Sequence, residues 1–214
     1  MTHDQKLACL RGLYVITDEQ LTAGDSLAKK LEAALEGGAK VVQYRDKSHG
    51  FDYRLAQALR AQTLCFAYDA LFLINDDIEL ASYMLADGVH LGQSDISLTE
   101  AREKLGERAI IGISCEGSIE LAEKAVEQGA DYIAFGAIYP SKTKPDAATI
   151  SVDVVQQAKQ KFTLPVCAIG GIELSNAQPL LNTGCDMLAV VNSVFGQDDI
   201  QQAATSFSQM FEEN

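Results

Sequence analysis

The sequence predicts an α/β fold of one domain, a (β/α)8 TIM barrel that spans residues 1–214. Three observations predict it. Short apolar segments recur eight times, helix-forming segments lie between them, and the apolar segments become polar or glycine-rich at their carboxyl ends. Eight strand and helix alternations in about 200 residues suit a closed barrel. An open doubly wound sheet is the alternative, and the lack of a GxGxxG motif after the first apolar segment counts against it.

The predicted strands carry several adjacent apolar residues, a pattern that is typical of parallel strands covered on both faces. In chain order they are LYVITD from Leu13, VVQYRD from Val41, LFLIND from Leu71, GVHLGQ from Gly88, IIGISC from Ile110, YIAFGAI from Tyr132, PVCAIGG from Pro165 and MLAVVNS from Met187. Most of them end in polar residues or glycine. Because the active site of such a barrel lies at the carboxyl ends of its strands, these endings are the candidate functional positions.

Helices are predicted between the strands, because parallel strands need crossover connections. The segments with apolar residues at helical spacing are SLAKKLEAALEGG, FDYRLAQALRAQ, SLTEAREKLG, SIELAEKAVEQG and SVDVVQQAKQKF. The predicted N-terminal caps are Ser97 with Glu100 as a capping box, Ser151, and Asp77. The glycines expected in a left-handed turn after a helix are Gly37, Gly106 and Gly129. The long loop YPSKTKPDAAT, from Tyr139, has a length that is common among lids.

Composition and charge exclude several classes of protein. The chain is 47% hydrophobic and 22% charged, as soluble globular proteins are. No apolar run approaches the ~18 residues of a membrane span, so no membrane association is expected. The formal net charge of −13 repels nucleic acids and anionic lipids. The five cysteines are scattered and form no CxxC pair, which argues against disulfides and zinc and indicates a reducing cytoplasm.

Three polar residues occupy alternate positions where the second strand ends. Gln43, Arg45 and Lys47 therefore share one face if the strand stays extended. Two cations and an amide on one face suit a multiply charged oxyanion and a hydrogen-bonding ring, because arginine binds phosphate in bidentate fashion and lysine supplies a point charge. The alternative is a solvated strand end without a binding role.

Acidic and amide residues end the next two strands. Asn75 and Asp76 end the third strand, and Asp95 follows the fourth in the run GQSD. Adjacent barrel strands place these ends side by side. Because Mg2+ characteristically takes one or two carboxylates and completes its octahedron with water and substrate phosphate, the sequence predicts an Mg2+ site at Asp76 and Asp95. The alternative for Asp95 is a turn residue before the following helix.

Two further groups of residues indicate phosphate binding. The loop after the sixth strand offers hydroxyls and cations at Ser141, Lys142, Thr143 and Lys144. At the seventh and eighth strands the endings are Gly170, Gly171, Asn192 and Ser193. Barrels commonly build a phosphate site after their last two strands. The alternatives are a solubilising surface loop and an ordinary tight turn.

Taken together, the motifs VVQYRDK, LINDD, DGVHLGQSD, IGIS, FGAIYPSKTKP, AIGGI and AVVNS resemble the thiamine phosphate synthase family, in the same order and over nearly the whole chain. The most specific parts are Q-x-R-x-K paired with N-D-D, the later G-Q-x-D, and the P-[ST]-x-T-K loop. The resemblance implies a transferase that joins a thiazole phosphate, or its carboxylated form, to an aminopyrimidine diphosphate and releases pyrophosphate. It implies passage through a pyrimidine cation, with Mg2+ on the diphosphate.

The resemblance also implies roles for particular residues. Those that would hold the pyrimidine diphosphate are Gln43, Tyr44, Arg45, Asp46, Lys47, Asn75, Ser114 and Lys144. Those that would hold the thiazole phosphate are Ser141, Lys142, Thr143, Gly171, Val191 and Asn192. Asp76 and Asp95 would hold Mg2+, and the catalytic residues would be Arg45, Lys47, Ser114 and Lys144. Ser141 and Asn192 stand where threonine and serine are more usual in the family, and both can still form hydrogen bonds.

Two other functions remain open on the sequence. A thiazole tautomerase on a related barrel would need a general base but no diphosphate site. A noncatalytic sensor of phosphate ligands would bind both ligands without turnover. The cation and carboxylate set favours the synthase. A homodimer is the expected assembly, because such barrels commonly pair.

Overall fold

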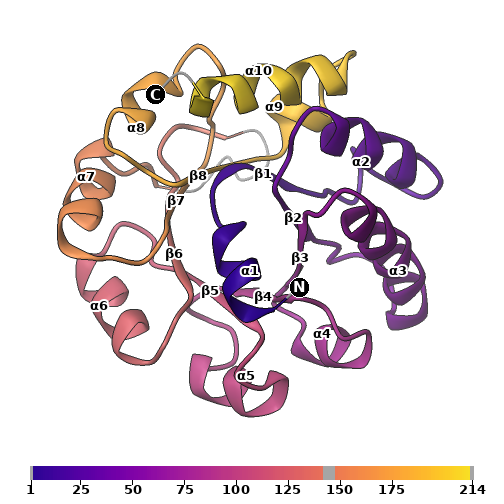
Figure 1. Cartoon of the computed structure of the whole chain (residues 1–214), viewed down its shortest axis with the longest axis horizontal. Coiled ribbons are helices and arrows are strands. Elements are labelled where there is room, and N and C mark those ends of the chain that lie inside the picture. The colour runs from indigo at the N-terminus through magenta and orange to yellow at the C-terminus, as the bar shows by residue number, and fades with distance from the viewer. Residues whose placement is uncertain (1, 142–147, 213–214) are drawn as a thin grey trace.

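The structure is a computed structural model that describes residues 2–141 and 148–212. Eight parallel strands form a closed barrel in which each strand pairs with the next in sequence and β8 pairs with β1 (Figure 1). The strands are β1 (Gly12–Ile16), β2 (Val41–Tyr44), β3 (Leu71–Asn75), β4 (Gly88–Leu91), β5 (Ile110–Ser114), β6 (Tyr132–Phe135), β7 (Val166–Ile169) and β8 (Met187–Val190). The predicted barrel is confirmed, all the predicted strands form, and the open sheet is excluded.

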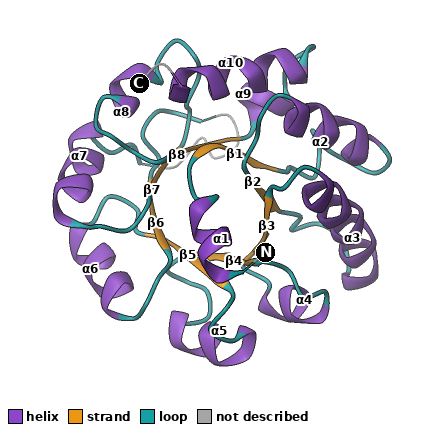
Figure 2. Ribbon diagram, in the orientation of Figure 1, coloured by secondary structure: helices purple, strands orange, loops and turns teal. Residues whose placement is uncertain are grey.

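Helices form the outer layer around the barrel (Figure 2). They are α2 (Ser26–Glu36), α3 (Phe51–Ala67), α4 (Ile78–Tyr83), α5 (Leu98–Leu105), α6 (Ile119–Glu127), α7 (Val152–Lys161), α8 (Gln178–Leu181), α9 (Asn192–Phe195) and α10 (Ile200–Glu212), in addition to an N-terminal α1 (His3–Ala8). The helices α1, α8, α9 and α10 were not among those predicted. Within the described residues, no helix has both the length and the apolar character to span a membrane.

The predicted helix caps are confirmed, with one exception. Ser97 and Glu100 form the capping box, Ser151 accepts from the Asp153 N–H, and Asp77 accepts from the Leu80 N–H. Gly106 and Gly129 have the expected positive φ.

The prediction for Gly37 is wrong. Its φ is −75°, and Gly38, with φ of +95°, makes the left-handed turn instead. The physical reason is a close approach, because a Cβ on Gly37 would lie 2.5 Å from the Cβ of Ala204 on α10. Gly37 therefore allows α10 to pack closely against the end of α2.

Side chains alternate along the strands between two separate cores. On β1, Leu13 and Val15 face the helices and belong to the outer core, whereas Tyr14 and Ile16 face the interior of the barrel. This period of two also decides which polar side chains at the strand ends can enter the barrel. On β2, for example, Tyr44 belongs to the outer core, so the preceding Gln43 faces inward.

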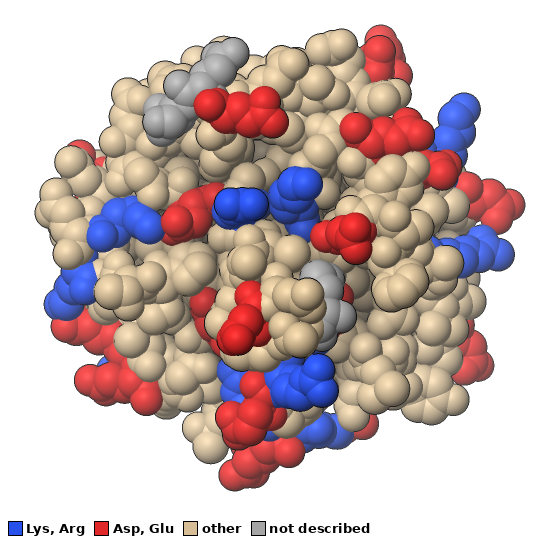
Figure 3. Space-filling model, in the orientation of Figure 1, with Lys and Arg blue, Asp and Glu red and all other residues tan. Residues whose placement is uncertain are grey.

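The amino end of the barrel is closed by α1, which crosses the centre of the ring in Figures 1 and 2. Leu10, just after α1, is 2% exposed and packs in the inner core. The Lys6 side chain on α1 forms a 3.0 Å ion pair with Asp87 before β4. Acidic and basic side chains are interspersed on this face of the molecule (Figure 3).

Three aspartates immediately precede β4, β6 and β8 and repeat one arrangement at the amino end. Each accepts a backbone N–H from the preceding strand and pairs with a basic side chain: Asp87 with Phe72 N and Lys6, Asp131 with Ile111 N and Arg102, and Asp186 with Val166 N and Lys159. At the matching place before β2 stands Lys40, so the arrangement occurs at three of the four even strands. These contacts satisfy strand N–H groups that would otherwise lack partners.

Candidate active site

A cavity of about 870 Å3 lies at the carboxyl ends of the strands and is large enough for a substrate of ordinary metabolite size. Many of the predicted site residues line it together: Gln43, Arg45, Lys47, Asn75, Asp76, Asp95, Ser114, Ser141, Gly171, Val191 and Asn192. Lys142, Thr143 and Lys144 lie outside the described residues. The structure thus brings residues from the ends of β2, β3, β4, β5, β7 and β8 to one place.

The polar residues at the end of β2 and just after it divide between two environments. Gln43, Arg45 and Lys47 line the cavity, as their alternate spacing predicts. Tyr44 and Asp46 face away from it and line a separate small recess. The Asp46 carboxylate accepts from the N–H groups of Ser48 and His49, and so shapes the turn before α3. The structure therefore does not place Tyr44 and Asp46 among the cavity residues, because the strand alternates its faces.

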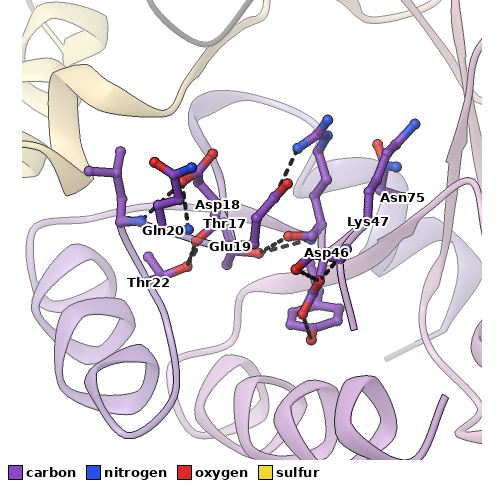
Figure 4. A network of polar contacts seen from close by, with 12 residues as sticks. Thr17, Asp18, Glu19, Gln20, Thr22, Asp46, Lys47 and Asn75 are labelled. Carbon is purple, nitrogen blue, oxygen red and sulfur yellow. Dashed lines mark hydrogen bonds and ion pairs between the residues drawn. The ribbon is translucent and has the colours of Figure 1, made fainter. Parts of the chain in front are cut away.

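Arg45 is held at its backbone by Thr17 and at its side chain by Glu19, and both of these residues are labelled in Figure 4. The buried Thr17 hydroxyl accepts from the Arg45 N–H at 2.8 Å and donates to the Arg45 carbonyl at 3.2 Å. The Arg45 guanidinium forms a 3.2 Å ion pair with Glu19. Thr17 follows β1, so the two adjacent strands fix this cation at the rim. An anionic ligand must share Arg45 with the Glu19 carboxylate.

Asp76 receives two side-chain contacts on the same oxygen. Lys47 Nζ lies 2.8 Å from Asp76 Oδ2, and Asn75 Nδ2 donates to that oxygen at 2.7 Å. The Asp76 backbone has a φ of 61°, a left-handed conformation that is costly for a residue other than glycine and is typical of functional sites. Its N–H donates to the carbonyl of His90, which connects the end of β3 to β4.

The carboxyl groups of Asp76 and Asp95 interact directly. Burial raises the pKa of Asp76, but hydrogen bonds with Lys47, Asp95 and Asn75 outweigh this, so its pKa lies below the ordinary value. Burial and the neighbouring Asp76 carboxylate raise the pKa of Asp95, although the Gly92 N–H donates to it at 2.7 Å. Two carboxylates held together in this way repel each other, and a cation between them would relieve the repulsion.

The donor set fits Mg2+ better than a softer metal. Among the described residues, no group of three or more His, Cys, Asp and Glu side chains is placed to bind a metal. Such a group is typical of zinc sites. Mg2+ needs only one or two carboxylates besides water and substrate phosphate, and Asp76 with Asp95 supplies that number.

Gly170 and Gly171 serve a close packing of loops as well as the cavity. Both have positive φ, at 102° and 61°. A Cβ on Gly170 would lie 2.5 Å from Ala137 Cα, and one on Gly171 would lie 2.3 Å from the Pro140 carbonyl oxygen. The glycine pair thus lets the β7 loop lie against the loop after β6. This packing holds the ends of β6 and β7 together beside Asn192 at the start of α9.

The sequence reasoning missed several cavity residues. His90 is half-buried, stacks on Tyr132 and lines the cavity. Gln93, which donates to the Ser114 carbonyl at 2.5 Å, and Glu116 also line it. The alternation of β4 could have identified His90, because Val89 and Leu91 belong to the outer core.

Comparison with known proteins agrees with this geometry. The model of the thiamine monophosphate synthase family matches residues 13–194. The chain belongs to this family. The family's model thus spans the barrel from β1 to α9, and the resemblance predicted from the motifs is confirmed.

Individual members of the thiamine monophosphate synthase family are similar over almost their full length. The thiamine-phosphate synthase of Marinobacter nauticus is 52% identical, with 94% of this chain and 90% of that protein covered. The thiamine-phosphate synthase of Thioalkalivibrio sulfidiphilus is 47% identical, with 95% and 96% covered. The solved structure of thiamine phosphate pyrophosphorylase from Pyrococcus furiosus is 35% identical, with a TM-score of 0.88 and 97% and 98% of the two chains covered.

Proposed function

We propose that this chain is a thiamine phosphate synthase, a transferase that joins a thiazole phosphate to an aminopyrimidine diphosphate and releases pyrophosphate. Its family and its relatives of that name support this activity. One observation carries the proposal for the site. The cations Arg45 and Lys47 line the same cavity as the interacting carboxyls of Asp76 and Asp95. A tautomerase needs no such diphosphate site.

The residues around the diphosphate would stabilise the leaving group. Arg45 presents a planar fork that suits two phosphate oxygens, and Lys47 adds a point charge. Asp76 and Asp95 would hold Mg2+, which, when bound, supplies positive charge that neutralises the departing pyrophosphate. Because Lys47 is already paired with Asp76, the Lys47 ammonium and the Asp76 carboxylate are fixed relative to each other. Preorganised charge of this kind stabilises the transition state without rearrangement.

The remaining cavity residues would orient the two reactants. Gln43 and Ser114 offer an amide and a hydroxyl to the pyrimidine, and Asn75 supports Asp76. Ser141, Gly171, Val191 and Asn192 would bind the thiazole phosphate, together with Lys142 and Thr143 of the loop after β6. Lys144 of that loop would contact the diphosphate. A displacement that passes through a cation depends on proximity and on the exclusion of water, and two neighbouring pockets in one cavity provide both.

A reconstituted assay tests the activity. Purified chain, Mg2+, the thiazole phosphate and the aminopyrimidine diphosphate should yield thiamine phosphate and pyrophosphate in equal amounts. Omission of any component should abolish the signal. Binding of both ligands without product would indicate a sensor, and isomerisation of the thiazole substrate alone would indicate a tautomerase.

We also propose that the chain works in the cytoplasm as a homodimer. Five of the six exposed large hydrophobic side chains among the described residues lie on α3 or at the end of α4: Phe51, Leu59, Phe66, Tyr83 and Leu85. Phe66 and Leu85 are each 84% exposed. Together the five present on the order of 600 Å2, so two copies facing each other would bury about 1,200 Å2, the lower range of a stable interface.

Sedimentation equilibrium tests the dimer. The wild-type chain should sediment as a dimer, and Phe66→Glu should dissociate it because each copy would bury an unpaired charge in the interface. Leu174→Glu, at the sixth exposed site, is the matched control and should leave the dimer intact. A monomeric wild-type chain would contradict the proposal.

A further inference from the structure

Two fully buried tyrosines connect two cavity residues beneath the floor of the site. Gln43 Nε2 donates to the Tyr14 hydroxyl at 2.5 Å, the Tyr14 and Tyr132 hydroxyls lie 3.0 Å apart, and Tyr132 lies 2.7 Å from His90 Nδ1. Tyr14 is 1% exposed and Tyr132 is 0% exposed. Gln43 and His90 line the cavity, so one continuous chain of hydrogen bonds runs through the inner core from one side of the floor to the other.

The packing of the barrel leaves room for these four hydrogen-bonded side chains. A Cβ on Gly112 would lie 1.9 Å from the Tyr132 ring, so only glycine at this point of β5 leaves room for it. The two tyrosine rings meet edge to face, with centroids 6.2 Å apart, and His90 stacks on Tyr132 at 5.5 Å. Burial raises the pKa of both tyrosines, so both hydroxyls keep their protons. Both rings are therefore held firmly by packing on either side.

With Gln43 Nε2 toward the Tyr14 hydroxyl, as the structure has it, only one arrangement of protons places a hydrogen in each of the three hydrogen bonds and leaves neither tyrosine proton without an acceptor. The amide of Gln43 donates to Tyr14, the Tyr14 hydroxyl donates to Tyr132, and the Tyr132 hydroxyl donates to His90 Nδ1. If His90 Nδ1 carried the proton instead, Tyr132 would donate to Tyr14, and the Tyr14 proton would be left without an acceptor in the core. Buried hydroxyl donors without acceptors are disfavoured.

We propose that Tyr14 and Tyr132 are positioning residues that fix the Gln43 amide and the His90 tautomer, and thereby select the edge of the ring that binds at the cavity floor. The amide nitrogen of Gln43 is committed to Tyr14, so its oxygen is the atom turned to accept from a ligand. His90 carries its proton on Nε2. A ring with an amino group at this position can donate to the Gln43 oxygen. A ring with an oxygen there would place two acceptors against each other.

The specificity part of this inference rests on the proposed function and deepens it. It names the amino group of the aminopyrimidine as the group that Gln43 recognises. Sites that hydrogen-bond a substrate group discriminate strongly against analogues that lack it, because a buried partner is then left unpaired. Neither tyrosine lines the cavity among the described residues, so their effect on the ligand must pass through Gln43 and His90.

The tautomer of His90 can be measured without any variant or substrate. The chain contains three histidines, and a long-range 15N–1H correlation spectrum of the labelled full-length protein resolves the protonated nitrogen of each ring. We expect wild-type His90 to carry its proton on Nε2 with Nδ1 unprotonated. In Tyr132→Phe the donor to Nδ1 is lost, so both tautomers should appear. A wild-type His90 that is protonated on Nδ1 would overturn the proposal.

The role of Tyr14 is tested by ligand discrimination. Binding of the 4-aminopyrimidine diphosphate and its 4-oxo analogue would be measured by calorimetry with Mg2+ present. We expect the wild-type chain to prefer the amino form by at least about 10-fold, and Tyr14→Phe to reduce this preference to within about 3-fold, because the amide can then turn. Tyr68→Phe, which removes a hydroxyl at the end of α3, is the control and should keep the wild-type ratio.

The two measurements separate the possible failures. If Tyr14→Phe is folded by circular dichroism and keeps the full preference, the positioning role is wrong. If neither pyrimidine diphosphate binds the wild-type chain, the proposed function and the ligand specificity are both contradicted. In that case the His90 tautomer would still test whether the hydrogen bonds from Gln43 to His90 are arranged as proposed.

Discussion

The two ends of the barrel use charged side chains in opposite ways. At the amino end, Asp87, Asp131 and Asp186 each have a basic partner and a backbone N–H to accept, and α1 covers the opening. At the carboxyl end, Asp76 and Asp95 face each other in a cavity, and Asp76 adopts a left-handed backbone conformation. The barrel therefore carries separately paired carboxylates at its amino end and two carboxylates brought against each other at its carboxyl end.

This difference indicates a division between stability and function. Paired and hydrogen-bonded carboxylates at the amino end lower the free energy of the folded state. Opposed carboxylates raise it until a cation or ligand is bound, and such stored cost is typical of functional sites. Substitutions at the amino end should therefore reduce stability, and substitutions at the carboxyl end should reduce turnover.

Asp131→Ala tests the amino end and should have the largest effect on stability. It removes the partner of Arg102 at 2.7 Å and the acceptor of the Ile111 N–H at 2.8 Å. The side chains of Arg102 and Asp131 are 16% and 10% exposed, so the loss leaves the strand N–H without its acceptor and a largely buried guanidinium without its counter-charge, although Arg102 still donates to backbone carbonyls. We expect the free energy of unfolding to fall by roughly 2–4 kcal/mol in urea titrations. kcat should stay near the wild-type value, and exposed Glu127→Ala is the control.

Asp76→Ala and Asp95→Ala test the carboxyl end. Each removes a proposed Mg2+ ligand, and we expect turnover to fall by at least roughly 100-fold, which corresponds to about 2.7 kcal/mol of transition-state stabilisation. Asp95→Ala should not lower the midpoint of thermal unfolding, because it removes one of two opposed carboxylates. Asp76→Ala should lower it slightly, because it also removes the ion pair with Lys47 and the hydrogen bond from Asn75. Near-normal activity of both variants at limiting Mg2+ would reject the metal assignment.

Lys144→Ala extends the comparison to the loop after β6. Lys144 lies outside the described residues, so its role as a diphosphate contact rests on the sequence motif. If it contacts the leaving group, turnover should fall by roughly 10-fold to 1000-fold. Stability should change by no more than about 0.5 kcal/mol. Lys29→Ala, which changes an exposed lysine on α2, is the matched control. Equal activity of the two variants would indicate that Lys144 does not contact the diphosphate.

Asp46 should be an exception to the division between stability at the amino end and turnover at the carboxyl end. It lies at the carboxyl end, but we expect it to contribute to stability. Burial raises the pKa of Asp46, but hydrogen bonds from Ser48 and His49 outweigh this and hold the pKa below its ordinary value. Its contribution is therefore fully present above that ordinary value and is lost as pH falls through the lowered pKa in the folded state. Asp46→Ala should cost about 1–2 kcal/mol near neutral pH, and the difference from wild type should shrink below about pH 4. A pH-independent difference would assign the effect to packing.

The fold and much of the candidate site could be predicted because they depend on local patterns. The period of two placed Gln43, Arg45 and Lys47 on one face, and the order of strands in a barrel placed Asp76 beside Asp95. Local capping chemistry likewise marked Ser97, which forms its capping box as predicted. Each of these features is decided by neighbours in sequence or by the regular geometry of a parallel barrel.

Other features depend on residues that are distant in sequence, and only the tertiary structure decided them. Gly37 is required by α10, and Gly171 is required by the loop after β6. The chain from Gln43 through Tyr14 and Tyr132 to His90 joins four different strands. No local pattern predicts these hydrogen bonds. In the sequence an inward-facing tyrosine cannot be told from any other core residue, because only the closed barrel brings its hydroxyl to a partner. The sequence by itself determined which residues reach the rim, and closure of the barrel determined which of them touch.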